Sequence, residues 1–348
     1  MLMPSKTQRQ MKLLENISLK PYNTFGIDAR AKYLASFSSL EELQEVLNNQ
    51  SLALHNSLVL GGGSNILLTK DVDGLVLKNE IKGIDIVSED EEYVYVKVGG
   101  GENWHQFVLY CIEKNLAGVE NLSLIPGNVG ASPMQNIGAY GVEIKDVFHS
   151  LEAMHIGEMK MQTFSNNDCA FGYRESVFKN KYKGQFIITS VTYRLNKKPT
   201  FNTSYGAIQQ ELEKMGVQEL SIKVVSQAVI NIRSSKLPDW TKIGNAGSFF
   251  KNPQVKNAKF HELKQMFPTI PSFPVDETHT KIPAGWLIEQ CGWKGYHKGD
   301  AGCYEKQALV LVNYGSATGS EIYSLSQEII ESVQNKFGIS LEREVNII

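Results

Sequence analysis

The spacing of apolar residues along the chain predicts a mixture of short strands and amphipathic helices. Alternating or continuous apolar runs predict strands over 31–37, 58–60, 66–69, 74–77, 93–98, 147–154, 160–164, 186–195, 308–313 and 339–348. Helical spacing predicts helices over 38–47, 102–115, 207–215, 226–234, 281–292 and 318–337. Pro238 follows the fourth of these helices and is expected to mark a domain boundary.

One long stretch, 122–141, fits neither period. It is rich in glycine and proline, carries no charged residue, and contains apolar residues such as Leu124, Met134 and Ile137. Disordered segments are charged and poor in apolar residues, so we expect an ordered loop wrapped around something flat with a polar edge. The alternative is a buried crossing loop that holds no ligand.

A second glycine-rich turn, Gly61-Gly62-Gly63-Ser64-Asn65, follows the apolar strand at 58–60. The G-x-G-x-x-G spacing of a Rossmann turn is absent, and short strands rather than a helix are predicted to follow it. Backbone N–H groups in such a turn can still converge on a phosphate. The turn is therefore interpreted as a phosphate loop, with a plain hairpin turn as the alternative.

Two further segments hold reactive side chains in apolar surroundings. Arg174 lies in a predicted loop among Phe171, Tyr173 and Phe178, where an arginine is typically aimed at a carboxylate or phosphate rather than at solvent. Ser248 lies between small residues and two phenylalanines. No G-x-S-x-G elbow or nearby histidine supports a serine hydrolase. A general acid remains possible for Ser248, against the simpler alternative of a serine in a tight turn.

Composition narrows the class of protein. The chain has 348 residues, 42% of them hydrophobic, which is enough for two or three domains. A net charge of -2 gives no basic surface for nucleic acid, and no apolar run reaches the length of a membrane span. The polar N-terminus lacks a signal-peptide core, and four dispersed cysteines suggest neither a metal site nor a redox motif. We expect free thiols in a reducing cytosol and therefore a soluble intracellular, cytoplasmic enzyme.

Eight motifs follow one another along the chain: NTFGI, VLGGGSN, GVENLSLIPGNVGASPMQNIGAYG, FGYRES, KLPD, GNAGSFFKNP, AGWLIEQCG and LEREV. In this order the chain resembles the bacterial UDP-N-acetylenolpyruvoylglucosamine reductases of peptidoglycan precursor synthesis, over 19–348. Tyr205 places it beside the branch with a tyrosine-bearing substrate loop. Each motif alone is moderately specific, whereas their order and spacing are very specific.

The resemblance implies an α+β fold. An FAD-binding domain of the vanillyl-alcohol-oxidase type would consist of two subdomains, 17–85 and 86–237, after a leader at 1–16. An α/β substrate-binding domain would occupy 238–338, and the strand at 339–348 would return to the second subdomain. The expected protein is a monomer.

The resemblance also implies the chemistry. NADPH would reduce non-covalently bound FAD, and the enolpyruvyl group of UDP-N-acetylglucosamine-enolpyruvate would then receive hydride at C3 and a proton at C2, giving UDP-N-acetylmuramate. Arg174 would stabilise the charge that develops on the carboxylate, Glu344 would bind its other side with a bound or shared proton, and Ser248 would protonate C2.

The remaining site residues follow from the same resemblance. Substrate contacts are assigned to Tyr173, Tyr205, Arg233, Lys236 and Asn252. FAD contacts are assigned to Gly61, Gly62, Gly63, Ser64, Asn65, Pro126, Gly127, Gly130, Ala131, Ser132, Gln135, Asn136, Gly138, Ala139, Tyr140 and Gly141. No metal is expected.

Some positions depart from the family pattern, and two other functions stay open. Arg343 stands where proline is frequent, Asn346 where a basic residue is common, and Glu175 where aspartate is usual. An FAD-dependent oxidase of an alcohol or sugar is one alternative, but only His55 could tether the flavin near the cofactor loops. A nucleotide-sugar-binding regulator without catalysis is the other, which the three intact catalytic candidates disfavour.

Overall fold

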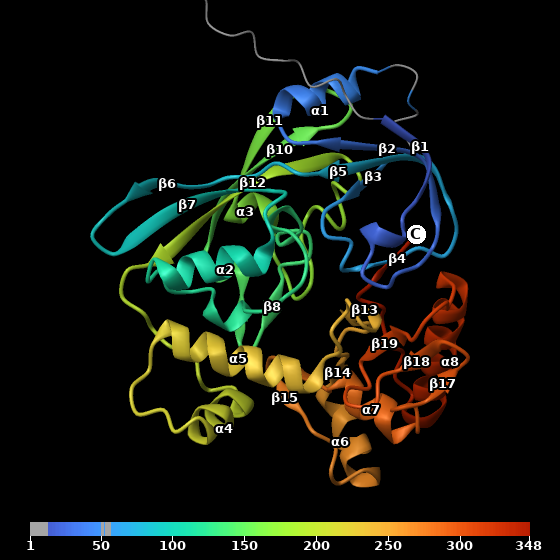
Figure 1. Ribbon diagram of the computed structural model, residues 1–348. Helices are drawn as coiled ribbons and strands as arrows, with labels where there is room; N and C mark the ends of the chain where they lie inside the picture. The colour runs from blue at the N-terminus through green and yellow to red at the C-terminus, as the bar shows by residue number, and fades with distance from the viewer. Residues whose placement is uncertain (1–12, 50–51, 53–56) are drawn as a thin grey trace, which may run out of the picture.

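The structure is a computed structural model that describes residues 13–49, 52 and 57–348. Its first unit is a four-stranded sheet of order β1-β2-β5-β3, in which β1 runs antiparallel and the others parallel to β2 (Figure 1). Helix α1 (Leu40–Leu47) begins at the Ser39 cap and packs its apolar face on this sheet. The strands are β1 (Leu13–Ser18), β2 (Arg30–Phe37), β3 (Leu58–Leu60) and β5 (Val72–Asn79).

The second unit is an antiparallel sheet of order β11-β10-β12-β7-β6. Helix α2 (Trp104–Glu113) covers it, with Phe107 stacked 4.8 Å from the buried ring of Tyr193. The 122–141 stretch continues from this layer and contains only a short 3-10 turn and the two-residue strand β8 (Gly138–Ala139). The strands are β6 (Ile84–Glu89), β7 (Tyr93–Gly99), β10 (Phe148–His155), β11 (Met161–Ser165) and β12 (Phe186–Asn196).

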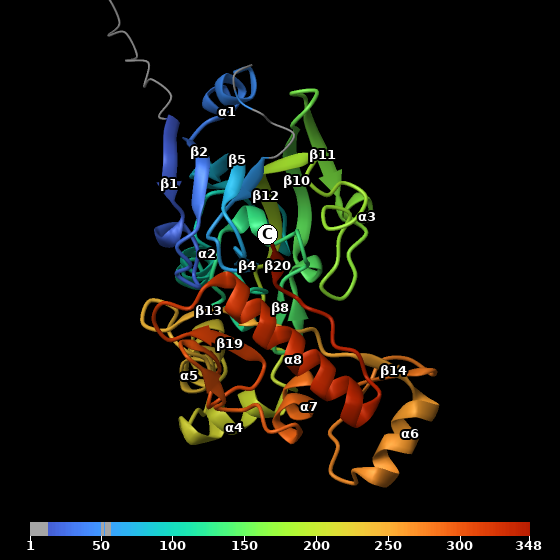
Figure 2. The same ribbon diagram turned by 90° about the vertical axis from the view of Figure 1, so that its right-hand side faces the viewer.

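A helical pair and the C-terminal unit complete the molecule. Helices α4 (Gly206–Lys214) and α5 (Ile222–Lys236) pack together, and Pro238 follows the second of them. The C-terminal unit has a sheet of order β13-β19-β18-β17, a small sheet of order β14-β16-β15, and the long helix α8, which runs along one side (Figure 2). Its elements are β13 (Gly244–Ser248), β14 (Gln254–Lys256), α6 (Asn257–Met266), β15 (Phe273–Pro274), β16 (His279–Lys281), α7 (Ala284–Gln290), β17 (His297–Lys298), β18 (Ala301–Cys303), β19 (Val310–Asn313) and α8 (Gly319–Phe337).

The first sheet and the C-terminal unit share one hydrophobic core. Buried residues of the N-terminal part, such as Phe25 and Leu60, belong to the same cluster as Phe249, Leu287 and Phe337. Backbone bonds reinforce this contact, since Asn245 N donates to Thr24 O at 3.0 Å. The C-terminal unit is therefore anchored to the first sheet, while the second sheet has a core of its own.

The end of the chain differs from the prediction. Only β20 (Asn346–Ile347) is a strand, and it pairs in parallel with β4 (Ile66–Leu67) rather than with the second subdomain. The expectation of a ten-residue strand returning to 86–237 is wrong, because residues 339–345 cross between units and make a single bridge from Arg343 to Phe250. Figure 1 shows the C-terminus beside β4.

Other differences are local. Residues 13–16 of the expected leader belong to β1, and residues 1–12 lie outside the described part of the chain. The helix expected over 281–292 is shorter, because Lys281 ends β16 and α7 begins only at Ala284. Strand β6, helix α6 and the small sheet at β14–β16 were not predicted. The other predicted helices and strands are confirmed within a few residues.

Candidate active site

Arg174 is held by a tight turn in which Gly172 and Glu175 form a bridge. Its backbone has the left-handed φ of +58°, which a residue other than glycine adopts at a cost and which is common at functional sites. The guanidinium donates from Nη2 to the carbonyl of Gly138 at 2.6 Å and lies 5.5 Å from the ring of Tyr173. Of the three neighbouring aromatic residues in the sequence, Tyr173 is the one whose ring faces the Arg174 guanidinium.

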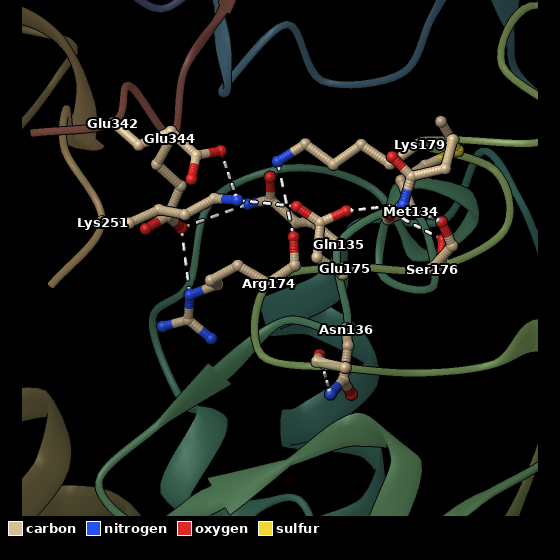
Figure 3. A network of polar contacts seen from close by, with 12 residues as sticks. Met134, Gln135, Asn136, Arg174, Glu175, Ser176, Lys179, Lys251, Glu342 and Glu344 are labelled. Atoms are coloured by element: carbon tan, nitrogen blue, oxygen red, sulfur yellow. Dashed lines mark hydrogen bonds and ion pairs between the residues drawn. The ribbon is translucent and has the colours of Figure 1, made fainter. Parts of the chain in front are cut away.

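Glu344 meets this arginine from the crossing segment at the end of the chain. Arg174 Nε lies 3.0 Å from Glu344 Oε1, and the two side chains are only 19% and 12% exposed (Figure 3). Gln135 Nε2, from the central loop, lies 3.4 Å from the same carboxylate oxygen. Burial raises the pKa of Glu344, although the positive charges of Arg174, Lys179 and Lys251 act in the opposite direction.

Ser248 ends strand β13, one residue before the point where the chain meets the Glu344 backbone. The next residue, Phe249, donates its N–H to Leu309 O at 2.7 Å and accepts the N–H of Glu344 at 2.8 Å. Ser248 is thus one residue from a direct backbone bond to Glu344. The structure thus pairs Arg174 with Glu344 and brings the backbone next to Ser248 to Glu344, three segments that are far apart in the sequence.

The glycine turn and the central loop pack directly on each other. A Cβ on Gly62 would lie 2.7 Å from the Cα of Gly127, so only glycine fits at this crossing. Ser64 Oγ donates to Pro126 O at 3.2 Å, and Asn65 Nδ2 donates to Gln135 Oε1 at 2.6 Å. The two segments assigned to the cofactor therefore form one continuous surface.

A cavity of about 330 Å³ adjoins this surface. Its lining includes Lys78, Asn79, Lys82 and Asn128, which are hydrogen-bond donors or cations. The ammonium of Lys78 also bonds the carbonyl of Gly61, and burial lowers its pKa. The carboxylate of Glu80 also lines the cavity, and the cations and amides beside the glycine turn are the groups that fit the diphosphate of a dinucleotide.

Some residues assigned to the cofactor support the loop from inside. The hydroxyl of the buried Ser132 bonds the Tyr193 hydroxyl at 2.7 Å and the carbonyl of Val129 at 2.8 Å. The side chain of Asn136, also buried, donates to Glu143 at 2.8 Å. These two buried side chains, like those of Ser64, Asn65 and Gln135, are thus engaged in hydrogen bonds within the protein.

The substrate candidates form a group around a second arginine. Arg233, near the end of α5, is partly buried, and burial lowers its pKa while the neighbouring Arg174 acts in the same direction. Tyr140 and Tyr205 make an edge-to-face contact at 5.5 Å, and Arg233 acts electrostatically on Tyr140. Lys236 is exposed three residues further along α5.

Tyr173 and Asn252 form a second group of substrate candidates, in contact with Arg174 through the Tyr173 ring. The Tyr173 hydroxyl interacts with Asn252, and Lys281 Nζ lies 4.9 Å from the Tyr173 ring centroid. Asn252 Oδ1 accepts the N–H of Ala284 at 2.9 Å, which fixes the side chain at the start of α7. Lys281 was not predicted as a site residue; its position three residues before the AGWLIEQCG motif is its one sequence signal.

Two guanidinium nitrogens in this group lack hydrogen-bond acceptors. Within the described part of the chain, the buried side-chain polar atoms without such a partner are Arg174 Nε, Arg233 Nε and Trp293 Nε1. Arg174 Nε is close to Glu344 as an ion pair but is not aligned for a hydrogen bond. Unsatisfied buried donors are costly, so two arginines in this state fit a site for an anionic ligand.

Other types of site find no support in the described residues. They contain no cluster of side chains suited to a metal ion and no helix long and apolar enough to cross a membrane. All four cysteines are free. His55, the residue considered for a covalent flavin link, lies outside the described residues.

Comparison with known proteins identifies two parts of the chain. Residues 31–160 match the model of an FAD binding domain, and residues 238–348 match the model described as "UDP-N-acetylenolpyruvoylglucosamine reductase, C-terminal domain". A protein of that name from Flavobacterium johnsoniae is 53% identical over 97% of this chain and 100% of its own length. The chain belongs to the UDP-N-acetylenolpyruvoylglucosamine reductase family.

Further members of the family support this placement. The protein of the same name from Amoebophilus asiaticus is 54% identical over 97% of this chain and 100% of its own length. The crystal structure of the family member from Thermus caldophilus superposes with a TM-score of 0.67 at 23% identity, covering 97% of this chain and 98% of the other. The expected α+β fold, with an FAD-binding domain and a family-specific C-terminal domain, is confirmed.

Proposed function

We propose that this chain reduces the enolpyruvyl group of UDP-N-acetylglucosamine-enolpyruvate to give UDP-N-acetylmuramate, using non-covalently bound FAD and NADPH. The names of its full-length relatives and the matched FAD-binding domain support this reaction. The reaction would supply a precursor of peptidoglycan. We expect the enzyme to act as a monomer in the cytoplasm.

The observation that carries this proposal is the buried pairing of Arg174 with Glu344 beside Ser248. Arg174 Nε lies 3.0 Å from Glu344 Oε1 and keeps unused hydrogen-bonding capacity. A cation and a carboxyl group whose raised pKa favours its protonated form can together bind a substrate carboxylate on two sides. The adjacent Ser248 hydroxyl supplies a proton donor.

These residues match the charge that must develop during the reaction. Bound FAD supplies the transfer of hydride from NADPH to C3 of the enolpyruvyl group. Negative charge then builds at C2 and spreads onto the carboxylate, where Arg174 stabilises it and protonated Glu344 donates to the other oxygen. Ser248 gives its proton to C2, which saturates the carbon–carbon double bond. Solvent restores the serine proton.

The rest of the site would bind the two nucleotides. The glycine turn at 61–65 and the central loop would hold FAD, with Lys78 close to the diphosphate. Arg233 offers an unpartnered buried Nε, and Lys236 an exposed ammonium, to the diphosphate of the substrate. Tyr173, Tyr205 and Asn252 would contact its sugar and pyrimidine parts.

The deciding experiment is an anaerobic visible spectrum of the purified protein. NADPH should bleach the flavin absorbance, and UDP-N-acetylglucosamine-enolpyruvate should restore it. Recovery only with oxygen would instead support an oxidase of the same fold, and a colourless protein that still binds the UDP-sugar would support a non-catalytic regulator. Either result would overturn the proposed reaction.

A further inference from the structure

Lys251 is a nearly buried lysine that bonds two carboxylates at once. Its side chain is 9% exposed, and its Nζ lies 2.6 Å from Glu175 Oε1 and 2.6 Å from Glu342 Oε1 (Figure 3). Lysine is rarely buried unless it is paired. The two carboxylate bonds raise the pKa of Lys251 although burial acts against them, so the ammonium stays charged.

Each member of this ion-pair triad lies beside a residue of the proposed catalytic set. Glu175 directly follows Arg174, and Glu342 lies two residues before Glu344. Lys251 lies three residues after Ser248. Two backbone hydrogen bonds align the 249–251 and 342–344 segments: Lys251 N donates to Glu342 O at 2.9 Å, and Glu344 N donates to Phe249 O at 2.8 Å. One ammonium therefore joins the three segments that carry the three catalytic candidates.

We propose that Lys251 is a positioning residue that fixes Arg174, Ser248 and Glu344 relative to one another for the reduction of the substrate. This inference rests on the proposed function. The three segments are far apart in the sequence and share no strand pairing other than the bridge from Phe250 to Arg343. Misplacement of catalytic groups by about 1 Å can slow a reaction by about 100-fold, so a contact that sets their spacing affects the rate without touching the substrate.

The charges around the triad allow positioning to be separated from a general electrostatic effect. Arg174, Lys179 and Lys251 lie among Glu175, Glu342 and Glu344, so groups of both signs surround the triad. Lys251→Met removes a positive charge, whereas Glu342→Gln removes a negative one, and both abolish the same ion pair, of which Glu342→Gln leaves at most a weaker neutral hydrogen bond. Positioning predicts that both substitutions slow the reaction. A field effect on the anionic substrate predicts opposite changes.

The test uses the FAD-loaded protein and follows each half-reaction separately by flavin absorbance. Lys251→Met is expected to leave flavin reduction by NADPH within about 2-fold and to slow reoxidation by UDP-N-acetylglucosamine-enolpyruvate by about 100-fold at saturating substrate. Glu342→Gln should slow the same step by about 5-fold to about 20-fold, because Lys251 keeps its second carboxylate. Lys251→Arg should recover part of the loss, since it keeps a charged donor.

Lys97→Met is the matched control. Lys97 Nζ also lies 2.6 Å from a carboxylate oxygen, Glu152 Oε2, but this pair joins strands β7 and β10 of the second sheet. Both half-reactions of this variant should match the unmodified protein. The thermal unfolding midpoint of each variant is measured together with its rates. A slow rate caused by unfolding can then be distinguished from one caused by misplaced catalytic residues.

Several results would overturn the inference. It fails if Lys251→Met reoxidises at the normal rate, if both half-reactions slow equally, or if Glu342→Gln speeds the step that Lys251→Met slows. Should Lys251→Met not fold, Glu342→Gln decides the matter, because Glu342 is 68% exposed and tolerates the change. Failure of the unmodified protein to reoxidise with this substrate would count against the proposed function instead.

Discussion

Arg174 and Glu344 form a buried ion pair, with Nε 3.0 Å from Oε1, although one comes from a loop beside the second sheet and the other from the end of the chain. The pair is incomplete, because Arg174 Nε has no aligned hydrogen-bond acceptor. Gln135 from the central loop approaches the same carboxylate. The contact thus joins the loop assigned to FAD, the arginine turn and the tail at a single point.

Replacing Arg174 by lysine should slow substrate reduction by about 100-fold, because an ammonium cannot present two parallel donors to a carboxylate. The measurement is the rate at which UDP-N-acetylglucosamine-enolpyruvate reoxidises the reduced flavin. Arg194→Lys is the control: Arg194 also lies over a tyrosine ring, that of Tyr93 at 4.7 Å, but on an exposed strand position. Normal turnover of Arg174→Lys would mean that Arg174 is structural.

Ser248→Ala should separate the two half-reactions. Flavin reduction by NADPH does not require the Ser248 proton and should be unchanged, whereas reoxidation by the substrate should fall by about 100-fold to about 10,000-fold. Stopped-flow absorbance measures both steps on one preparation. The exposed Ser88, on the edge strand β6, supplies the control variant Ser88→Ala. Equal losses in both steps of Ser248→Ala would remove the proton-donor role.

Local sequence signals predicted most elements of the fold. Helix α8 begins at the Thr318 capping box and ends at Gly338 with a left-handed φ of +66°, and both signals are readable from the sequence alone. Strand β13 was missed because its glycine-rich sequence is typical of a turn. Pairing with β19 makes it a strand, and that partner is distant in the sequence.

The candidate site was predictable only in part, for the same reason. Arg174, Ser248 and Glu344 were assigned from the motifs, and the structure pairs Arg174 with Glu344 and bonds the Glu344 backbone to the residue after Ser248. Lys251 was missed, although it is a charged residue directly after the apolar Phe249 and Phe250 in the GNAGSFFKNP motif. Its two carboxylate partners come from other segments, so no local pattern reveals them.

Gly62→Ala should weaken FAD binding. Its new Cβ would lie 2.7 Å from the Cα of Gly127, so the glycine turn and the central loop would have to separate. The measurement is the ratio of flavin to protein after purification and dialysis. Gly157→Ala provides a control, because a Cβ there meets only His155 at 3.5 Å. A Gly62→Ala protein with full flavin content would place the cofactor elsewhere.

Thiol labelling of the folded protein should distinguish its cysteines. Burial raises the pKa of Cys169 and of Cys303 to about 12, and it raises that of Cys111 well above its ordinary value, so these thiols stay protonated and unreactive at neutral pH. Cys291 is only partly buried and should react first. Mass spectrometry after timed alkylation reads each site, and Cys291→Ser should remove the fast phase. Rapid modification of Cys169 would contradict its placement in the core.

The raised pKa of Glu344 predicts how stability depends on pH. Because the folded value lies above the unfolded one, the folded protein holds the Glu344 proton over a wider pH range. This stabilising contribution is complete below the unfolded pKa and is lost as the pH rises through the folded pKa. In Glu344→Gln the contribution is absent, so the difference in thermal unfolding midpoint between the unmodified protein and this variant should fall with rising pH.

Glu152 gives the opposite sign and serves as the comparison. Hydrogen bonds from Lys97 and Ser190 lower the pKa of Glu152, so its contribution is present above the unfolded pKa and is lost as the pH falls through the folded one. Unfolding midpoints are measured between about pH 4 and about pH 8 for the unmodified protein, Glu344→Gln and Glu152→Gln. As the pH rises, the stability lost in Glu344→Gln should shrink, whereas the stability lost in Glu152→Gln should grow. If the stability lost in both variants instead changes with pH in the same direction, Glu344 is ionised in the folded protein. The arginine would then face a charged carboxylate before substrate binds, and the substrate carboxylate would have to displace Glu344 rather than share its proton.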